Sequence, residues 1–288
     1  MRVLLAGCGD VGGRLAQRLL DQGAEVYGLR RRTAGLPAGV IPVEADLGQA
    51  LLPPQWPVGA LDYVVYCAAA SAHTEAGYRL AYVQGMAHVL EWLARSDQQP
   101  RRILFTSSSG VYAQDDGVWV DEDSAAEGDG FSARLMREAE SHLLNSGLPA
   151  TVVRLTGLYG PGRQRLLQQA WQGAAVQQQA PLYANRIHVD DAAGLLAYLL
   201  AADQRGEPLA SCYLGVDDDP APLQEVLSWL RRKLGAPTAQ ADQWVRRAGS
   251  KRCSNARARA LGWRPMYPSY REGYTQILAE QPWRPNGA

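Results

Sequence analysis

The N-terminal stretch MRVLLAGCGDVGGRLAQRLL, residues 1–20, decides the fold. Its first part, Arg2–Ala6, is a short apolar run that predicts a buried strand. Gly7, Gly9 and Gly12 follow with G-x-G-x-x-G spacing, and apolar residues at helical spacing come next. A strand, a glycine turn and a helix in this order are typical of a dinucleotide site, because the turn lets a pyrophosphate reach the backbone at the helix N-terminus. The alternative is an ordinary glycine-rich turn.

The composition narrows the class of protein. The 288 residues carry 29 Lys+Arg against 29 Asp+Glu, and this balance gives no reason to expect nucleic acid or a membrane surface as a partner. The four cysteines lie far apart without a C-x-x-C, and the histidines show no metal-ligand spacing, which predicts reduced thiols and no metal site. The first strand leaves no room for a signal peptide, and no apolar run has the length of a membrane span. We therefore expect a cytoplasmic α/β protein.

Strands and helices are predicted to alternate after the first turn. Strands are expected at Glu25–Leu29, Val40–Glu44, Leu61–Cys67, Ile103–Thr106, Thr151–Leu155 and Cys212–Val216. Helices are expected over Tyr78–Ala94, Phe131–Leu144, Ala192–Ala202 and Leu223–Leu234, while Ile187–Asp191 is interpreted as a short turn. This alternation predicts a doubly wound parallel (Rossmann) sheet with helices on both faces.

The end of the second predicted strand bears on the choice of cofactor. Folds that prefer NAD offer a carboxylate to the ribose 2′-hydroxyl at this point. Here Arg30-Arg31-Arg32 stands in its place. A guanidinium forms a fork of donors that suits a 2′-phosphate, so the sequence favours NADP, with NAD as second choice. A solvated basic loop is the alternative.

Motifs over nearly the whole chain arrive in the order of one known family. After the glycine turn they are ADL at 45–47, YCAAAS at 66–71, YVQGMAHVLEWL at 82–93, SSSGVY at 107–112, EDS at 122–124, AEGDGFSARLMREAE at 126–140, VRLTGLYGPGR at 153–163, IHVDDAAG at 187–194 and NARARALGWRP at 255–265. The chain resembles the NAD-dependent epimerase/dehydratase family, the extended short-chain dehydrogenase/reductases. The resemblance implies a dinucleotide-binding Rossmann domain over 1–157, to which 187–216 return, and a smaller α+β substrate cap from 158–186 and 217–288.

The departures from the family pattern concern catalysis. The family's Y-x-x-x-K dyad is absent: its YGxSK segment lines up with residues 130–134, which places Gly130 at the tyrosine and Arg134 at the lysine. The only lysines, Lys233 and Lys251, lie far downstream. An arginine stays protonated and cannot relay a proton. The chain therefore resembles an atypical branch that binds a dinucleotide and lacks the usual dyad.

Site residues follow from the turn and from the resemblance. The predicted cofactor-binding residues are Gly7, Gly9, Asp10, Val11, Gly12, Arg30, Arg31, Asp46, Leu47, Cys67, Ala68, Ala69, Ser107 and Arg134. The predicted catalytic residues are Ser108, which matches the family's serine or threonine, Arg134 and Tyr112. Tyr112 and Tyr159 are candidate proton donors at strand ends, and structural packing is the alternative for both.

Two functions remain open from the sequence. The first is an NAD(P)-binding oxidoreductase or epimerase/dehydratase-like enzyme, acting on a small polar substrate, with a homodimer as the family's usual pairing. The second is a non-catalytic NADP-binding or redox-sensing regulatory protein, which the missing dyad favours. The retained Ser108 and the C-terminal cap favour the enzyme.

Overall fold

The computed structural model describes residues 1–176, 181–236, 249–280 and 283. The chain forms two compact units. Unit 1 comprises Met1–Val111, Ala126–Arg154 and Ala192–Tyr213, and unit 2 comprises Tyr112–Ala125, Leu155–Asp191 and Leu214–Ala288. Each unit is described by itself below.

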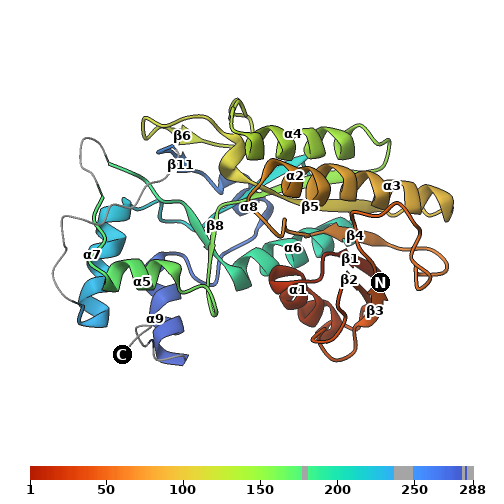
Figure 1. The fold of residues 1–288 in the computed structure, drawn as a ribbon, viewed down its shortest axis with the longest axis horizontal. Helices are drawn as coiled ribbons and strands as arrows, with labels where there is room; N and C mark the ends of the chain where they lie inside the picture. The colour runs from red at the N-terminus through yellow and green to blue at the C-terminus, as the bar shows by residue number, and fades with distance from the viewer. Residues whose placement is uncertain (177–180, 237–248, 281–282, 284–288) are drawn as a thin grey trace. The chain divides into compact units, whose positions relative to one another are not determined.

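Unit 1 follows the alternation of strands and helices that the sequence predicts (Figure 1). Its strands are β1 (Arg2–Ala6), β2 (Glu25–Arg30), β3 (Ile41–Glu44), β4 (Tyr63–Tyr66), β5 (Arg102–Ser108) and nearly all of β7 (Ala150–Leu155). Its helical segments are α1 (Asp10–Asp21), α2 (Glu75–Tyr78), the π-helical η1 (Arg79–Gln84), α3 (Gly85–Arg95), the 3₁₀ turn η2 (Ser109–Val111), α4 (Phe131–Leu144) and most of α6 (Val189–Gln204). Helices α3 and α4 lie on one side of the sheet, and α1 and α6 lie on the other (Figure 1).

The main sheet has seven strands in the order β10-β7-β5-β4-β1-β2-β3, where β10 is Cys212–Gly215. Pairing is parallel from β3 to β5, with Leu5 opposite Gly28 on one side and Val65 on the other. The predicted doubly wound parallel sheet is confirmed. The strand order reverses between β1 and β4, and folds of this class bind ligands outside the carboxyl ends of the strands at such a point. The glycine turn follows β1 at this position.

Water is excluded from the sheet of unit 1 because its central strands carry apolar side chains on both faces. Leu4, Leu5, Val64 and Val65 are fully buried. Helix α1 contributes Leu15 among its buried residues. A core of this kind holds the strand ends rigid, so the loops that follow them start from fixed points.

Unit 2 contains β6 (Trp119–Val120), β8 (Gly157–Tyr159), α5 (Arg165–Trp171), β9 (Arg186–His188), α7 (Leu223–Leu234), β11 (Arg252–Cys253), α8 (Ala256–Leu261) and α9 (Tyr270–Glu280). Its core packs apolar residues of α5, α7 and α9 together, including Leu167, Leu227 and Ile277. Helix α7 ends at Gly235 in the left-handed region, as the sequence predicts.

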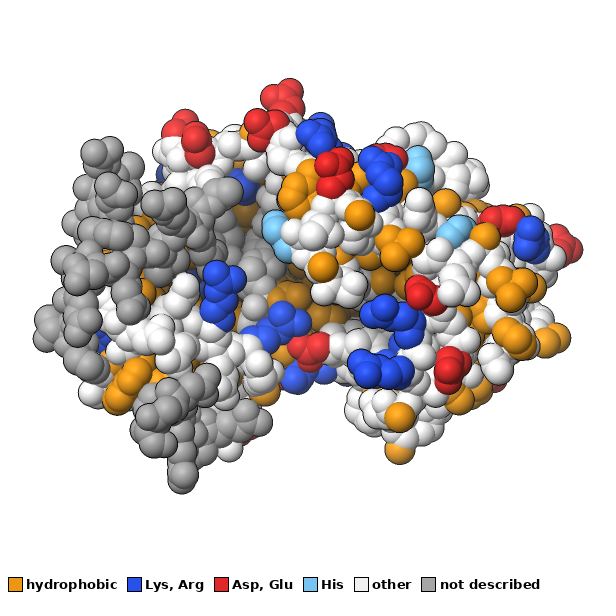
Figure 2. Space-filling view, viewed as in Figure 1, with side chains coloured by type: hydrophobic (Ala, Val, Ile, Leu, Met, Phe, Trp, Pro, Cys, Tyr) orange, Lys and Arg blue, Asp and Glu red, His pale blue; other side chains and the backbone are white. Residues whose placement is uncertain are grey.

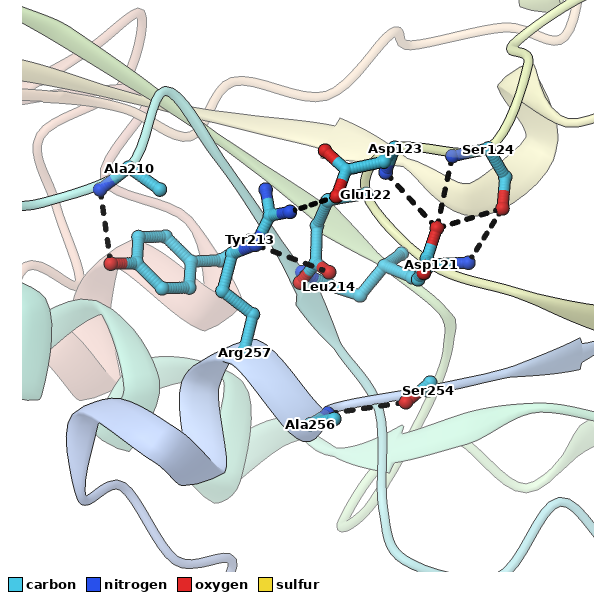
Figure 3. A network of polar contacts seen from close by, with 10 residues as sticks. All are labelled: Asp121, Glu122, Asp123, Ser124, Ala210, Tyr213, Leu214, Ser254, Ala256 and Arg257. Carbon is cyan, nitrogen blue, oxygen red and sulfur yellow. Dashed lines mark hydrogen bonds and ion pairs between the residues drawn. The ribbon is translucent and has the colours of Figure 1, made fainter.

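The acidic EDS loop of unit 2 has a structural use (Figure 3). The Asp121 side chain accepts the Ser124 amide at 3.0 Å and closes a turn. Buried Glu122 accepts the Leu214 amide at 2.7 Å, and Asp123 pairs with Arg257 at 2.6 Å. The loop is thereby tied to β10 and α8.

Two local predictions are wrong. Residues Ile187–Asp191 are not a turn, because Arg186–His188 pair in parallel with Gly157–Tyr159 and α6 begins at Val189. The predicted helix Tyr78–Ala94 is not one regular helix either: α2 ends at Tyr78, and the π-helical Arg79–Gln84 precedes α3. Pairing with a distant strand and a change of helical pitch both depend on tertiary packing, which local periodicity does not report.

Candidate dinucleotide site

The turn after β1 requires glycine at its first position. Gly7 has φ +94°, and a Cβ built there would lie 2.3 Å from the backbone of Ala68. The amides of Gly7 and Cys8 both donate to the carbonyl of Leu29 at 3.0 Å, which fixes the turn to the end of β2. The loop after β4 therefore packs directly on the turn after β1, at the point where the strand order reverses.

Gly12 closes the other side of the same turn. A Cβ there would lie 2.9 Å from the Cys67 sulfur and 2.9 Å from the Gly7 carbonyl oxygen. Cys67 itself is fixed, since its amide donates to the carbonyl of Ala6 at 2.8 Å. Helix α1 can approach the strand ends this closely only with glycine at this position.

Gly9 differs from both neighbours because its side-chain space is open. Within the described part of the chain, the nearest atom to a Cβ built there is the Gly7 carbonyl oxygen at 3.9 Å, an ordinary contact. Gly9 is the N-cap of α1, and no side chain caps the helix there. A helix N-terminus without a capping side chain and with an open approach suits a phosphate group. The residues present thus fit a dinucleotide pyrophosphate.

The other residues predicted around the turn have defined places. Asp10 pairs with Arg14 at 3.0 Å on the first turns of α1, and Val11 is buried. Asp46 accepts the Gly48 amide at 2.9 Å in the turn after β3, and the Leu47 carbonyl contacts the His88 ring at 2.7 Å. Contacts of these residues with a cofactor stay predictions.

Arg30 ends β2, where it lies opposite Glu44 of β3. It is half-buried and acts electrostatically on the Cys8 thiol of the glycine turn, while Arg31 is exposed. Figure 2 shows basic side chains gathered over the part of unit 1 that contains α1. This placement agrees with the position from which a ribose phosphate would be recognised.

The thiols beside the turn are protonated. Burial raises the pKa of Cys8 to about 11 and also raises the pKa of Cys67. The Cys67 thiol lies 3.4 Å from the Gly7 carbonyl oxygen, to which it donates. All four cysteines of the chain are free thiols. Ala68 and Ala69 continue the loop with side chains small enough for a ligand to lie against its backbone.

Ser107 takes part in a buried network that holds α4 against β5. Its hydroxyl donates to the Glu140 carboxylate, which also pairs with Arg154 at 2.7 and 3.0 Å. The Glu140 and Arg154 side chains are only 6% and 12% exposed, so the charges compensate each other inside unit 1. A cofactor contact from Ser107 remains a prediction.

The predicted catalytic residues of unit 1 have separate partners. Ser108 is half-buried at the end of β5, and its oxygen accepts the Gly110 amide at 3.0 Å. The Arg134 side chain is 55% exposed and donates to the Glu75 carboxylate at 3.4 Å and to the Asp129 carbonyl at 3.3 Å. At Gly130, the N-cap of α4, no described atom lies within 4 Å of a built Cβ. A side chain at position 130 therefore has room for its first carbon atom.

The two candidate tyrosines of unit 2 are both buried. Tyr112 is 3% exposed, and its carbonyl accepts the Lys251 ammonium at 3.1 Å. Tyr159 donates to the Ser269 carbonyl at 3.3 Å and packs on the rings of His188 and Tyr274. Burial raises the pKa of Tyr159 well above its usual range, which fits a packing role.

Sequence reasoning missed a pair that lies against the first turn of α4. The Nδ1 atom of His73 lies 3.2 Å from the Tyr78 hydroxyl. The Phe131 ring, next to Gly130, lies 5.1 Å from the His73 ring and 5.5 Å from the Tyr78 ring. The i,i+4 spacing of Tyr78 and Tyr82 is a signal for Tyr78 alone, and no sequence pattern indicates His73.

Comparison with known proteins agrees with this geometry. A model of the NAD dependent epimerase/dehydratase family matches residues 3–210. The chain belongs to this family, and the resemblance seen in its motifs is confirmed.

Individual relatives extend over almost the whole chain. The 3-diazoavenalumate denitrifying reductase of a Streptomyces species is 29% identical over 320 residues, covering 95% of this chain and 99% of that protein. A solved structure from Methylobacillus flagellatus, assigned to the NAD-dependent epimerase/dehydratases, is 35% identical with a TM-score of 0.79 and covers 97% of this chain and 98% of its own. WbmG of Bordetella bronchiseptica, solved with NAD and UDP, shares the fold at 18% identity, with a TM-score of 0.76 over 96% and 93% of the two chains.

Proposed function

We propose that this protein is an NAD(P)-dependent reductase acting on a small polar substrate, with NADP as the favoured cofactor. The observation that carries the proposal is the glycine turn. Other atoms of the protein occupy the side-chain space at Gly7 and Gly12, while Gly9 leaves an open approach to the N-terminus of α1. The similarity to a reductase supports reduction over epimerisation, which remains the other reaction of the family.

Different residues of the chain would bind different parts of the cofactor. The turn from Gly7 to Gly12 and the N-terminus of α1 would hold the pyrophosphate, Arg30 and Arg31 the 2′-phosphate, and the Cys67–Ala69 loop would lie against the dinucleotide. When bound, the cofactor supplies the hydride. Ser108 would hold the substrate oxygen by a hydrogen bond.

The preference for NADP is tested at the end of β2. Wild-type protein is expected to bind NADPH more tightly than NADH in calorimetric titrations. Arg30→Asp places a carboxylate beside the phosphate site, so NADPH affinity should fall by about ten- to a hundredfold, the equivalent of about 1–3 kcal/mol. Arg32→Asp is the matched control, because it makes the same charge change two residues further along an exposed loop. Equal wild-type affinities for the two cofactors would contradict the role of Arg30.

A second candidate is a dinucleotide-binding protein without turnover, which the absence of the Tyr-x-x-x-Lys dyad favours. NADPH consumption is measured by absorbance with small carbonyl compounds. Diazo compounds are tested as well, because the similar Streptomyces protein is a 3-diazoavenalumate denitrifying reductase. Substrate-dependent oxidation supports the reductase. Tight NADPH binding without oxidation by any of these compounds supports the regulatory protein.

The assembly and location are part of the same proposal. We expect a homodimer formed through α3 and α4, whose outer surface is grooved along Ala87, Leu90, His142 and Asn145. Light scattering measures this assembly, and a monomer would contradict it.

Free thiols agree with a reducing compartment, and we place the protein in the cytoplasm. In the described part of the chain, every helix is too short or too polar to cross a membrane.

A further inference from the structure

At the start of α4 the chain has Gly130, without a side chain, and the pair His73 and Tyr78 lies beside it. The resemblance to the family places its tyrosine at Gly130, and no described atom lies within 4 Å of a Cβ built there. The residue after it, Phe131, packs on both His73 and Tyr78. A phenol and an imidazole thus lie beside the turn from which the family's phenol is missing.

The contacts of the pair are those of an acid and its proton relay. The His73 Nδ1 to Tyr78 hydroxyl distance of 3.2 Å is that of a hydrogen bond, and the two rings meet edge to face with centroids 5.3 Å apart. His73 is exposed, so it exchanges protons with water, while Tyr78 is half-buried. Burial raises the pKa of Tyr78, which keeps the phenol protonated at neutral pH.

Local structure holds the pair in place. Thr74 is the N-cap of α2 and accepts the Gly77 amide at 3.1 Å, so the four-residue helix that ends at Tyr78 has a fixed start. Gly77 is required because a Cβ there would lie 2.8 Å from the Ala72 carbonyl oxygen. The π-helical Arg79–Gln84 follows directly, and such segments occur frequently at functional sites.

The charged groups around the pair are themselves paired. Glu75 of α2 lies 3.4 Å from Arg134 of α4, and Arg79 of η1 lies 3.0 Å from Glu138 of α4. These two ion pairs tie α2 and η1 to α4, which lies next to them (Figure 1). With opposite charges balanced on both sides, the positively charged nicotinamide of an oxidised cofactor would be the added charge that acts on the phenol.

We propose that Tyr78 donates the proton that the substrate takes up, in place of the family tyrosine that Gly130 replaces. His73 positions Tyr78 and reprotonates it. The inference rests on the proposed reductase function. As hydride adds to the substrate carbon, the electron pair of its C=O bond moves to oxygen, and this oxygen takes the phenolic proton of Tyr78. The resulting phenolate takes the proton of His73 Nδ1 as the other ring nitrogen takes a proton from a hydronium ion of the solvent, so His73 stays neutral and the reaction consumes one solvent proton. Tyr78 is the catalytic residue, and His73 is a positioning residue.

The test follows the ionisation of one tyrosine in the full-length protein. Tyrosine is labelled at Cζ for NMR, Tyr78→Phe identifies the signal, and the label is titrated with pH alone, with NADPH and with NADP⁺. Because an opposite charge favours the phenolate, NADP⁺ should move the Tyr78 titration to lower pH, and NADPH should not. Tyr82→Phe is the matched control, since its ring packs 5.1 Å from that of Tyr78 and its oxygen accepts the Ala70 amide at 3.4 Å.

Activity provides the second readout once a substrate is known. Tyr78→Phe should lower kcat by about 10²- to 10⁴-fold, the usual contribution of a general acid, while NADPH affinity stays unchanged. Gly130→Tyr in the Tyr78→Phe background should recover part of the loss, because position 130 has room for the first carbon atom of a side chain. His73→Gln should lower kcat less and change its pH dependence.

The outcomes separate this inference from the function on which it rests. NADP⁺ that binds without moving the Tyr78 titration, or Tyr78→Phe with wild-type turnover, overturns the role of Tyr78. Failure of both cofactors to bind overturns the reductase itself. If Tyr78→Phe does not fold, the His73→Gln protein is titrated instead, with its tyrosine signals assigned by their response to that substitution, and an absent NADP⁺ shift again overturns the proposal.

Discussion

Helices α1 and α4 of unit 1 both begin after an open glycine N-cap without a capping side chain, yet only the cap of α1 lies between two crowded glycines of a G-x-G-x-x-G. The turn before α1 is filled on two sides, by Ala68 against Gly7 and by Cys67 against Gly12. The turn before α4 is open at Gly130 across the residues that the structure describes. Packing and a positive φ require glycine at Gly7, whereas Gly130 has an extended backbone that any residue adopts. The second turn is packed two residues earlier, where a Cβ on Gly128 would lie 2.8 Å from that of Ala133. The fold therefore requires glycine at Gly7 and Gly12, and it does not require glycine at Gly130.

The largest effect is expected at Gly7. Gly7→Ala combines positive-φ strain with a clash against the Ala68 backbone at 2.3 Å, so the free energy of unfolding should fall by about 2–5 kcal/mol and NADPH binding should be lost. Denaturant unfolding and calorimetry measure both. Gly35→Ala is the control, because Gly35 has φ +89° and no described atom near its built Cβ. It should lose only about 1 kcal/mol from strain. Similar losses for both variants would mean that the contact with Ala68 is unimportant.

Gly12 is expected to have the next largest effect on binding. An added methyl group would lie 2.9 Å from the Cys67 sulfur and 2.9 Å from the Gly7 carbonyl oxygen, so the backbone of the turn must shift to admit it. We expect Gly12→Ala to weaken NADPH binding about tenfold, equivalent to about 1.4 kcal/mol. Gly13→Ala, whose methyl group meets only Pro37 at 3.8 Å, should bind normally. Normal binding by Gly12→Ala would show that the turn tolerates a wider approach.

The buried Cys8 thiol gives the crowded turn a pH dependence. Folded Cys8 keeps its proton to a pKa of about 11, above its ordinary value of 9.0, so the folded state holds more protons than the unfolded state between these values. The free energy of unfolding should therefore fall as pH rises through this interval. Cys8→Ala should reduce the slope by about 1 kcal/mol per pH unit, measured by urea unfolding. An unchanged slope would show that Cys8 does not report on the turn.

The smallest effect is expected at the open turn. Gly130 has φ −60° and ψ 148°, an extended conformation that any residue adopts. Gly130→Tyr should therefore fold, with a loss of about 0.5 kcal/mol from the poorer N-cap. Thermal unfolding should show a Tm within about 3 °C of wild type. A loss comparable to that of Gly7→Ala would remove the contrast between the two turns.

The sequence predicts most of what lies within one element or one turn. The strand, the glycine spacing and Arg30 are adjacent in the chain, so periodicity and spacing are sufficient to predict the sheet and the turn. The sequence did not predict the pairing of β8 with β9, because each strand has three residues and the two strands lie far apart in the chain. The sequence did not predict the His73–Tyr78 pair for a similar reason: its position beside Gly130 depends on the packing of Phe131, which lies more than one element away in the chain.

The buried network of Ser107, Glu140 and Arg154 has a consequence for evolution. It anchors α4 near its C-terminal half, and its charges are satisfied without any residue from the first turn. Substitutions at Gly130 or Arg134 therefore leave the helix attached to the sheet. We expect such an anchor to let the residues at the first turn of α4 vary during evolution without loss of the fold.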